Sequence, residues 1–285
     1  MSLYPITAKL TIITGAGRCG TKFFGQQLGR FVSNCHAEHE PETLYLGDLD
    51  DLHRQLARFG PNHFLMGKLL GTRGLRNHAI NYYRGRITRS ETIDRIRHDR
   101  RNVFKVDAEL LVEANYAWWS LTGLLDALAG NYRVITIARD PVDWILSVRR
   151  RRELLDRWNW LARLRLNRLS DLHWDEDPIV RLAHAWNIVH GELLQAASND
   201  ARHRIFRMED VFDPSGDAYR ELLAFAVHDE TASVDWPAAM AARTEVINPS
   251  KPGDTALEQS QLDQVADICG ETAQRLGYPA RRTAS

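Results

Sequence analysis

The stretch LTIITGAGRCGTKFFGQQL, from Leu10 to Leu28, carries the strongest indication of the fold in this chain. Its first part is a β-branched run closed by glycines, which predicts a buried strand that enters a tight loop. The residues after the loop are apolar at positions 23, 24, 28, 31 and 32, which is helical spacing. A strand, a glycine-rich loop and a helix in this order predict a phosphate site, because free backbone N–H groups meet the positive end of the helix dipole.

The loop departs from the nucleotide-triphosphate pattern G-x-x-x-x-G-K-[ST] at its end. Gly15 and Gly20 have the required spacing, but Thr21 and Lys22 follow in the reverse order. The position that holds Mg²⁺ in nucleotide triphosphatases therefore carries a cation, and a lysine cannot ligate a metal ion. A kinase built on this loop would lack its metal anchor, whereas a metal-free transfer would not need one. An ordinary strand-to-helix turn that requires glycine is the alternative interpretation.

Strands and helices alternate along the rest of the chain. The predicted strands lie in 9–17, 102–110, 132–141 and 203–211, and the predicted helices after the first are 115–130, 142–158, 178–198, 217–227 and 257–276. This order predicts an α/β fold, with a parallel sheet flanked by helices and a ligand site at the carboxyl ends of the strands. Two segments without a sheet pattern, about 45–100 and 150–180, are predicted as helical insertions.

The composition fits one domain that spans residues 1–285. Hydrophobic residues make up 44% of the 285 residues and charged residues 26%, both ordinary for a globular protein. The sequence has no apolar stretch near the roughly 20 residues that span a bilayer, and the amino-terminal residues do not resemble a signal peptide. Three cysteines form neither a disulfide framework nor a metal pattern. A cytoplasmic protein is expected.

The net charge is zero, but the cationic residues are concentrated in two segments. Residues 73–101 hold nine arginines against three acidic residues, and residues 149–168 hold eight against two. Solvated helix faces are one interpretation, and a surface for an anionic or membrane-surface acceptor is the other. A nucleic-acid module would carry a basic net charge, so no nucleic-acid partner is expected.

A second motif, ARDPVDWILSVRR, follows the clearest predicted strand. Arg139 at the strand end offers a planar guanidinium to a phosphate. Pro141 begins a helix, and Ser147 lies about two turns into it, on a face that can look back at the same ligand. The plainer interpretation is a capped helix that follows a strand.

GAGRCGTK and ARDPVDWILS together resemble the two cofactor motifs of PAPS-dependent sulfotransferases of the bacterial and Golgi type. PAPS is 3′-phosphoadenosine 5′-phosphosulfate, and that family has a P-loop-like fold and transfers a sulfuryl group without a metal ion. The resemblance implies a 5′-phosphosulfate site at Gly17, Arg18, Cys19, Gly20, Thr21 and Lys22, and a 3′-phosphate site at Arg139 and Ser147. Two residues depart from the family pattern: Cys19 replaces the usual Ser, and Lys22 replaces the usual second Thr.

Two later segments resemble the family less closely. FRMEDVFDP (206–214) is similar to a late strand end, and INPSKPGD (247–254) is similar to a loop that closes over the nucleotide. The second implies that Lys251 and Gly253 contact the cofactor. A surface turn rich in proline and glycine is the alternative for this segment.

Sulfuryl transfer to a hydroxyl requires a base, and the segment NCHAEHEPETLYL (34–46) is where one is expected. Several groups of sulfotransferases carry a catalytic Glu shortly after the first helix, and the HEP sequence at 39–41 is similar to it. The resemblance implies Glu40 as the general base, with Arg18 and Lys22 balancing charge on the transferred group. The rivals for the base in this segment are Glu38, Glu42, His36 and His39, and a solvated polar loop is the alternative for the segment.

Two further features are open at this point. Lys105 is predicted at a strand end, where it would face the sulfuryl group or serve solubility at a sheet edge. Tryptophans at 118–119, 144, 158, 160, 174 and 186 suit either an aromatic acceptor site or the core. The expected acceptor is a hydroxyl of a carbohydrate, a lipid or another small molecule. The alternatives are a Mg²⁺-dependent P-loop kinase or nucleotide triphosphatase, and a non-catalytic nucleotide-binding module.

Overall fold

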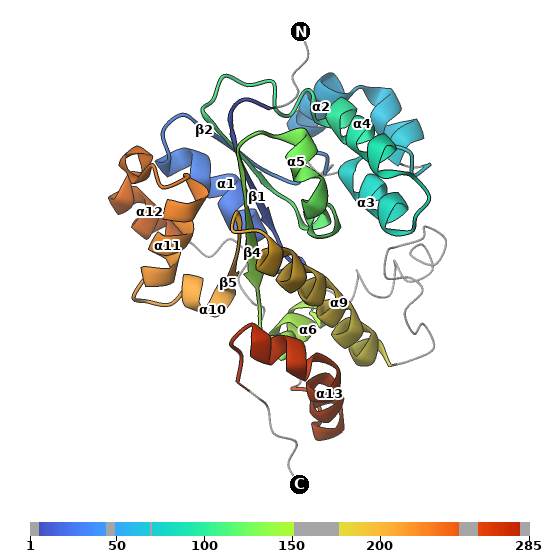
Figure 1. Cartoon of the computed structure of the whole chain (residues 1–285), viewed down its shortest axis with the longest axis vertical. Coiled ribbons are helices and arrows are strands. Elements are labelled where there is room, and N and C mark those ends of the chain that lie inside the picture. Colours follow the sequence, from blue (N-terminus) through green and yellow to red (C-terminus); the bar gives the residue numbers. More distant parts are fainter. Residues whose placement is uncertain (1–5, 44–48, 69, 151–176, 245–255, 280–285) are drawn as a thin grey trace.

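A five-stranded parallel sheet forms the centre of the molecule in the computed structural model (Figure 1). The structure describes residues 6–43, 49–68, 70–150, 177–244 and 256–279. The strands are β1 (Lys9–Thr14), β2 (Cys35–His39), β3 (Leu110–Ala114), β4 (Tyr132–Ala138) and β5 (His203–Arg207). An α/β fold with a parallel sheet flanked by helices, as the sequence predicts, is confirmed.

The strand order β2-β3-β1-β4-β5 places β1 at the centre of the sheet. Ile13 of β1 lies in register with Ala114 of β3 on one side and with Ile135 of β4 on the other. The chain leaves β1 toward β2 at one edge, and it leaves β4 toward β5 at the opposite edge. Such a reversal opens a crevice at the carboxyl ends of the two neighbouring strands. The two predicted phosphate motifs follow these two strands.

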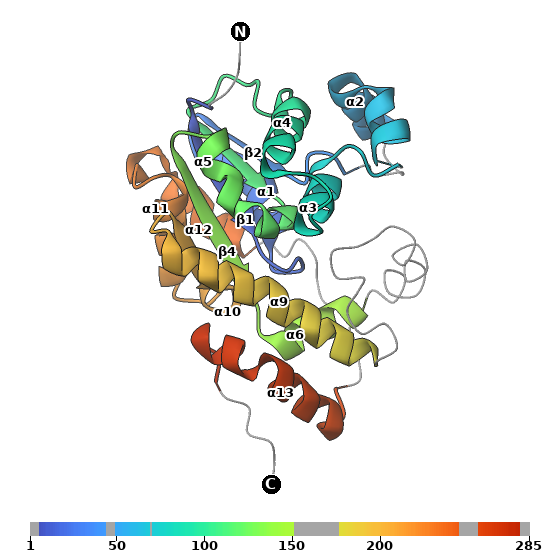
Figure 2. The same ribbon diagram turned by 45° about the vertical axis from the view of Figure 1, so that its right-hand side comes forward.

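Helices cover both faces of the sheet (Figure 2). They are α1 (Thr21–Phe31), α2 (Leu49–Phe59), α3 (Leu75–Tyr83), α4 (Arg89–Arg100), α5 (Leu125–Leu128), α6 (Pro141–Arg149), α9 (Pro178–Asn199), α10 (Met208–Val211), α11 (Asp217–Ala226), α12 (Trp236–Arg243) and α13 (Gln259–Arg275). A π-helix (His63–Lys68) lies between α2 and α3, and three 3₁₀ segments are Tyr116–Ser120, Thr122–Leu124 and Thr231–Ser233. Among the described residues, no helix combines the length and apolar character needed to span a bilayer.

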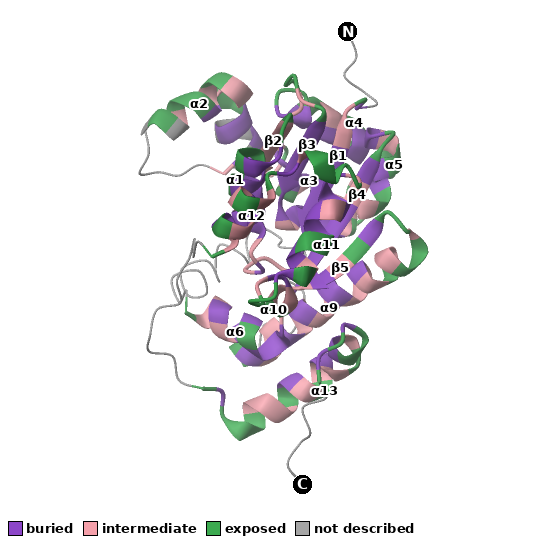
Figure 3. Cartoon of the chain, turned by 90° about the vertical axis from the view of Figure 1, so that its left-hand side faces the viewer, coloured by how far each residue is buried: buried purple, intermediate pink, exposed green. Residues whose placement is uncertain are grey.

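The core consists of two layers, because alternate residues of each strand face opposite sides of the sheet. Ile13 and Ile137 pack with residues of α1, α6, α9, α11, α12 and α13. Leu10 and Ile12 pack on the other face with residues of α3, α4 and α5. The strands β1, β3 and β4 are buried almost throughout, whereas every residue of the edge strand β2 is partly exposed (Figure 3).

Four sequence predictions need correction. The predicted strand 203–211 is a strand only as far as Arg207, and residues 208–211 form the helix α10. The segment 102–110 is not a strand, since β3 begins at Leu110 and the preceding residues form turns. The sequence pattern predicts no strand at residues 35–39, which form β2 and extend the sheet beyond β3. The segment 115–130 is not one helix but two 3₁₀ turns followed by the four-residue helix α5. The helical insertion before β3 is present as α2, α3 and α4, while 151–176 lies outside the described residues.

Two core histidines predict acid sensitivity. Burial lowers the pKa of His190 and of His203 to about 4, from an ordinary value of about 6.5. Between these values the unfolded chain binds more protons than the folded protein, so stability falls as pH falls through this window. We expect His190 alone to lower the free energy of unfolding by roughly 2 kcal/mol between pH 7 and pH 5. Urea unfolding at both pH values should show a smaller drop in His190→Leu, and an equal drop would contradict this.

Candidate functional site

The loop after β1 approaches the backbone of β4 closely. A Cβ atom at Gly15 would lie 2.5 Å from the carbonyl oxygen of Ile137, so no other residue fits there without a shift of the backbone. Gly20 has a φ of 81° and precedes α1, whose first turn has neither a side-chain cap nor an acidic residue. The amino terminus of α1 therefore offers backbone N–H groups and a positive dipole end to an anion.

The structure brings the two predicted motifs together beside this helix end. The Nε of Arg18 donates to the Oγ of Ser147 at 3.4 Å, and the Nη1 of Arg139 donates to the carbonyl oxygen of Arg18 at 3.3 Å. Ser147 is buried on α6, with 5% of its surface exposed. Two guanidinium groups and a hydroxyl thus meet at the carboxyl ends of β1 and β4, where they can bind a ligand with more than one phosphate.

Trp186, Trp144 and Glu209 hold the backbone of the two motifs, a role that the sequence did not indicate for them. The indole Nε1 of Trp186 donates to the carbonyl oxygen of Arg139 at 2.9 Å, and the indole Nε1 of Trp144 donates to that of Gly17 at 2.8 Å. Glu209 accepts a hydrogen bond from the backbone N of Asp140 at 3.0 Å. These contacts hold the backbone at and beside Arg139 and Arg18 in place. The buried tryptophans therefore have a structural role here, which a helical spacing of aromatic residues alone does not reveal.

The amino terminus of α6 differs from that of α1. The carboxylate of Asp140 caps it by accepting from the backbone N of Val142 at 2.9 Å and of Asp143 at 3.1 Å. This cap occupies N–H groups that would otherwise attract an anion. A phosphate at this corner would therefore be bound by the side chains of Arg139 and Ser147 and not by the helix end.

Two predicted cofactor residues turn their side chains inward. Cys19 is fully buried in the core, and its Sγ donates to the carbonyl oxygen of Gly17 at 3.0 Å. Burial raises the pKa of this thiol to about 12, so it stays protonated at neutral pH. Thr21 is 5% exposed as the first residue of α1. At Cys19 only the backbone is available to a ligand.

Lys22 and the predicted base lie on neighbouring elements. His39 ends β2, and its pKa falls to about 4 because it is buried and because the charge of Lys22 lies nearby. The Nε2 of His39 lies 3.8 Å from the Oε1 of Glu40, whose side chain is 24% exposed. In the described part of the chain Lys22 has no ion pair. A cation, an imidazole and a carboxylate therefore share the corner between α1 and β2.

Backbone conformation singles out the same residues. Five non-glycine residues among those described have a positive φ, and Arg18 at 56° and Glu40 at 43° are two of them. Such conformations cost free energy and gather at functional sites, where the surrounding structure holds them. The predicted sulfuryl-facing cation and the predicted base thus both have a backbone conformation that is rare for their residue type.

The rival carboxylates near Glu40 are held in ion pairs. Glu38 contacts the Nη1 of Arg58 at 2.8 Å and the Nε2 of His36 at 2.6 Å. Burial raises the pKa of Glu38, but the hydrogen bonds from His36 and Arg58 outweigh burial and hold it below its ordinary value. A carboxylate of low pKa that is paired in this way is a poor proton acceptor. Glu42 is buried and paired with Arg100.

Arg100 is the centre of a buried charge cluster beneath the turn that carries Glu40. Its side chain is fully buried, and it donates to both oxygens of Glu113 at 2.8 Å as well as to Glu42. The backbone N of Leu75 also donates to Glu42, at 3.0 Å. The cluster therefore connects the helical insertion to β3 and to the turn after β2.

Within the described ranges, Glu42, His63 and Asp99 are close enough together to hold a metal ion. Both carboxylates already accept hydrogen bonds, Glu42 from Arg100 and Asp99 from the Nε2 of His78 at 2.7 Å. Asp99 also accepts from Arg73 at 3.1 Å. Burial raises the pKa of Asp99, but His78, the backbone N of Gly74 and His63 together outweigh burial and lower it. Two guanidinium groups in contact with the carboxylates oppose a cation. We therefore interpret this group as a structural network.

Of three further predicted contacts, the structure describes Lys105 alone. Lys105 is exposed in the turns before β3 and does not lie at a strand end, because the predicted strand 102–110 is absent. Lys251 and Gly253 lie outside the described residues.

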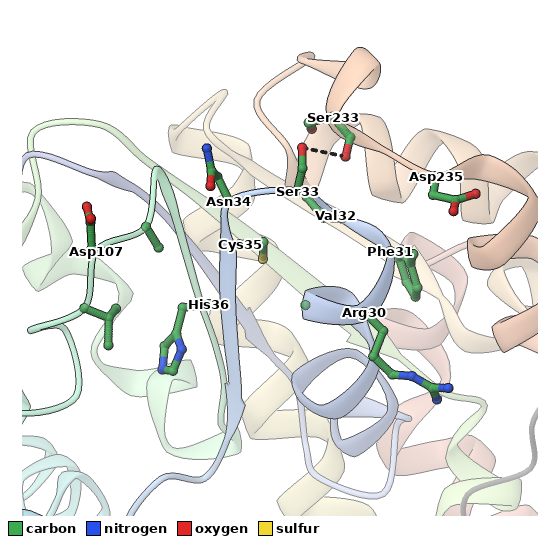
Figure 4. Close-up of a pocket in the computed structure, with 13 residues that line it drawn as sticks. Arg30, Phe31, Val32, Ser33, Asn34, Cys35, His36, Asp107, Ser233 and Asp235 are labelled. Atoms are coloured by element: carbon green, nitrogen blue, oxygen red, sulfur yellow. Dashed lines mark hydrogen bonds between the residues drawn. The ribbon is translucent and has the colours of Figure 1, made fainter.

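A groove of about 520 Å³ lies at the other end of the sheet (Figure 4). It is lined by residues around the end of α1, the start of β2 and the segment before β3, including Arg30, Asn34, His36 and Asp107. Its cationic and acidic side chains do not converge on one type of ligand. In parallel α/β sheets the carboxyl ends of the strands bind ligands, so we place the candidate site at Gly15–Lys22 and not in this groove.

A solved sulfotransferase domain resembles this chain in fold. No family model matches the chain, and no curated protein matches it in sequence. Among solved structures, the sulfotransferase domain from the curacin biosynthetic pathway has a TM-score of 0.50 and 16% identity, over 96% of this chain and 99% of that one. The sulfotransferase domain of the Synechococcus PCC 7002 olefin synthase has a TM-score of 0.46 and 13% identity, over 96% and 94%. The first of these likenesses shows that the chain has the fold of a sulfotransferase domain.

Proposed function

We propose that the protein transfers a sulfuryl group from PAPS to a hydroxyl of a carbohydrate, a lipid or another small molecule. The observation that carries the proposal is the pair of hydrogen bonds by which Arg18 contacts Ser147 and Arg139 contacts Arg18. These bonds join the glycine-rich loop to the second motif, across 129 and 121 residues of sequence. The fold shared with a solved sulfotransferase domain agrees with it.

The residues present fit the chemistry of this donor. PAPS supplies the sulfuryl group, and 3′,5′-ADP is the product left behind. The uncapped amino terminus of α1 and Lys22 suit its 5′-phosphate, and Arg139 with Ser147 suits its 3′-phosphate. Arg18 lies between the two and can balance charge on the transferred group. Glu40 accepts the proton of the acceptor hydroxyl.

Calorimetry with 3′,5′-ADP, ATP with Mg²⁺ and 5′-AMP tests the proposal. We expect 3′,5′-ADP to bind most tightly, because it engages both the loop and the second motif. Turnover of labelled PAPS with fractions of a cell extract would then identify the acceptor, and we expect it to persist in EDTA. If ATP with Mg²⁺ were the only one of the three nucleotides to bind tightly, the result would favour a P-loop kinase and overturn the proposal.

Replacing Arg139 tests which corner of the site binds which phosphate. We expect Arg139→Met to weaken the binding of 3′,5′-ADP by about 10- to 100-fold, because hydrogen bonds to charged groups contribute about 1.5–3 kcal/mol. The binding of 5′-AMP, which lacks the 3′-phosphate, should change far less. Arg220→Met, in an exposed ion pair with Asp217, is the matched control and should leave both affinities unchanged. Equal losses for the two nucleotides would contradict the assignment.

A further inference from the structure

The turn after β2 fixes a hydroxyl against the predicted base. The backbone N of Glu40 donates to the carbonyl oxygen of Ala114 at 3.0 Å and so continues the contact of β2 with β3. The backbone N of Thr43 then donates to the carbonyl oxygen of Glu40 at 2.8 Å and closes a tight turn. The Oγ1 of Thr43 donates to the Oε2 of Glu40 at 3.1 Å. The same threonine thus contacts both the backbone and the carboxylate of Glu40.

Glu42 anchors this turn to the buried charge cluster around Arg100. Glu42, inside the turn, is 6% exposed and accepts from Arg100 and from the backbone N of Leu75. Arg100 is in turn held by Glu113, the residue before Ala114 on β3. Thr43 therefore directly follows a residue that is buried and paired, and a hydrogen bond from an anchored donor restricts the orientation of the carboxylate it contacts.

We propose that Thr43 is a positioning residue, which holds the Glu40 carboxylate in the orientation that accepts the proton of the acceptor hydroxyl. In the transfer step the acceptor O–H bond breaks, its proton passes to Glu40, and the acceptor oxygen bonds to sulfur as the bond from sulfur to the phosphate oxygen breaks. Thr43 donates to Oε2 throughout and exchanges no proton. This inference rests on the proposed function.

Two substitutions separate the hydroxyl from the shape of the side chain. Thr43→Val keeps the branched shape and removes the donor, whereas Thr43→Ser keeps the donor. We expect Thr43→Val to lower kcat about tenfold with little change in the affinity for 3′,5′-ADP, and Thr43→Ser to restore most of kcat. Thr231→Val, on the exposed 3₁₀ turn Thr231–Ser233, is the control and should behave as the wild type. An unchanged kcat in Thr43→Val, or equal losses in both Thr43 variants, would overturn the proposal.

A second measurement does not depend on turnover. Carbon-13 NMR can follow the titration of the Glu40 carboxyl, which lies near the imidazole of His39, itself close to the charge of Lys22. Loss of a donor that favours the charged carboxylate should move the midpoint to higher pH in Thr43→Val but not in Thr43→Ser. An unmoved midpoint in Thr43→Val would overturn the positioning role. A moved midpoint in a protein that shows no turnover of PAPS would contradict the proposed function alone.

Discussion

Replacing Glu40 with Gln is expected to lower kcat by about 10²- to 10⁴-fold, which is the usual contribution of a general base. Gln has nearly the same shape but cannot take the proton of the acceptor hydroxyl. Glu40 lies on the turn after β2, whereas the nucleotide is expected to bind between β1 and β4. The affinity for 3′,5′-ADP should therefore stay the same, and the loss should appear in kcat.

Glu38→Gln is the matched control for this experiment. Glu38 lies two residues away but is paired with Arg58 and His36, so we expect its replacement to keep turnover within about tenfold of the wild type. Single-turnover rates and 3′,5′-ADP binding measured on both variants distinguish the two carboxylates. Full turnover in Glu40→Gln would contradict the assignment of Glu40 as the base. A larger loss of turnover in Glu38→Gln than in Glu40→Gln would indicate Glu38 as the base instead.

Arg100→Met is expected to produce the largest loss of stability, about 3–5 kcal/mol in the free energy of unfolding. Arg100 and Glu113 are both fully buried, and Glu42 is nearly so. Removing the guanidinium leaves two carboxylates in the core without the charge that compensates them. Burial already raises the pKa of Glu113 against the opposing effect of Arg100, so without Arg100 this carboxyl would be driven toward its protonated form.

Urea unfolding measures this effect, with an exposed ion pair as the comparison. Arg220 and Asp217 lie 3.3 Å apart at the surface, and Arg220→Met should change stability by less than about 1 kcal/mol. Adding Glu42→Gln and Glu113→Gln to Arg100→Met should recover part of the loss, because no buried charge is then left alone. A cost for Arg100→Met as small as that for Arg220→Met would contradict the role given to the cluster.

The sequence predicted the central part of the fold because its signals are local. β1 and β4 are apolar runs that end in glycine or in Asp140-Pro141, and these features define where each strand ends. The missed strand β2 is an edge strand with His36 and Glu38 among its five residues, so it lacks a continuous apolar run. β3 contains the charged Glu113, and its partner Arg100 lies on a helix 13 residues earlier. The hydrophobic pattern of a strand does not show that a charged residue within it has an ion-pair partner on a helix elsewhere in the chain.

In the candidate site, too, some residues could be predicted from the sequence and others could not. The glycine loop, Arg139 and Ser147 follow from motifs, and their proximity agrees with two strands that are neighbours in the sheet. The inward side chain of Cys19 does not follow, because a loop motif does not specify which side chains face the core. Trp186 and Glu209 are remote in sequence, and their contacts with the backbone of Arg139 and Asp140 arise only when the fold is complete.

The contacts of the backbone at Arg139 and Asp140 also bear on the order in which the protein folds. Its contacts come from Trp186 on α9 and from Glu209, whose other carboxylate oxygen accepts from the hydroxyl of Tyr278 near the carboxyl end of the chain. Contacts of such long sequence separation form late, because the closure of long loops must precede them. The support of the backbone at Arg139 and Asp140 is therefore expected to form late in folding, after contacts between residues that are close in sequence.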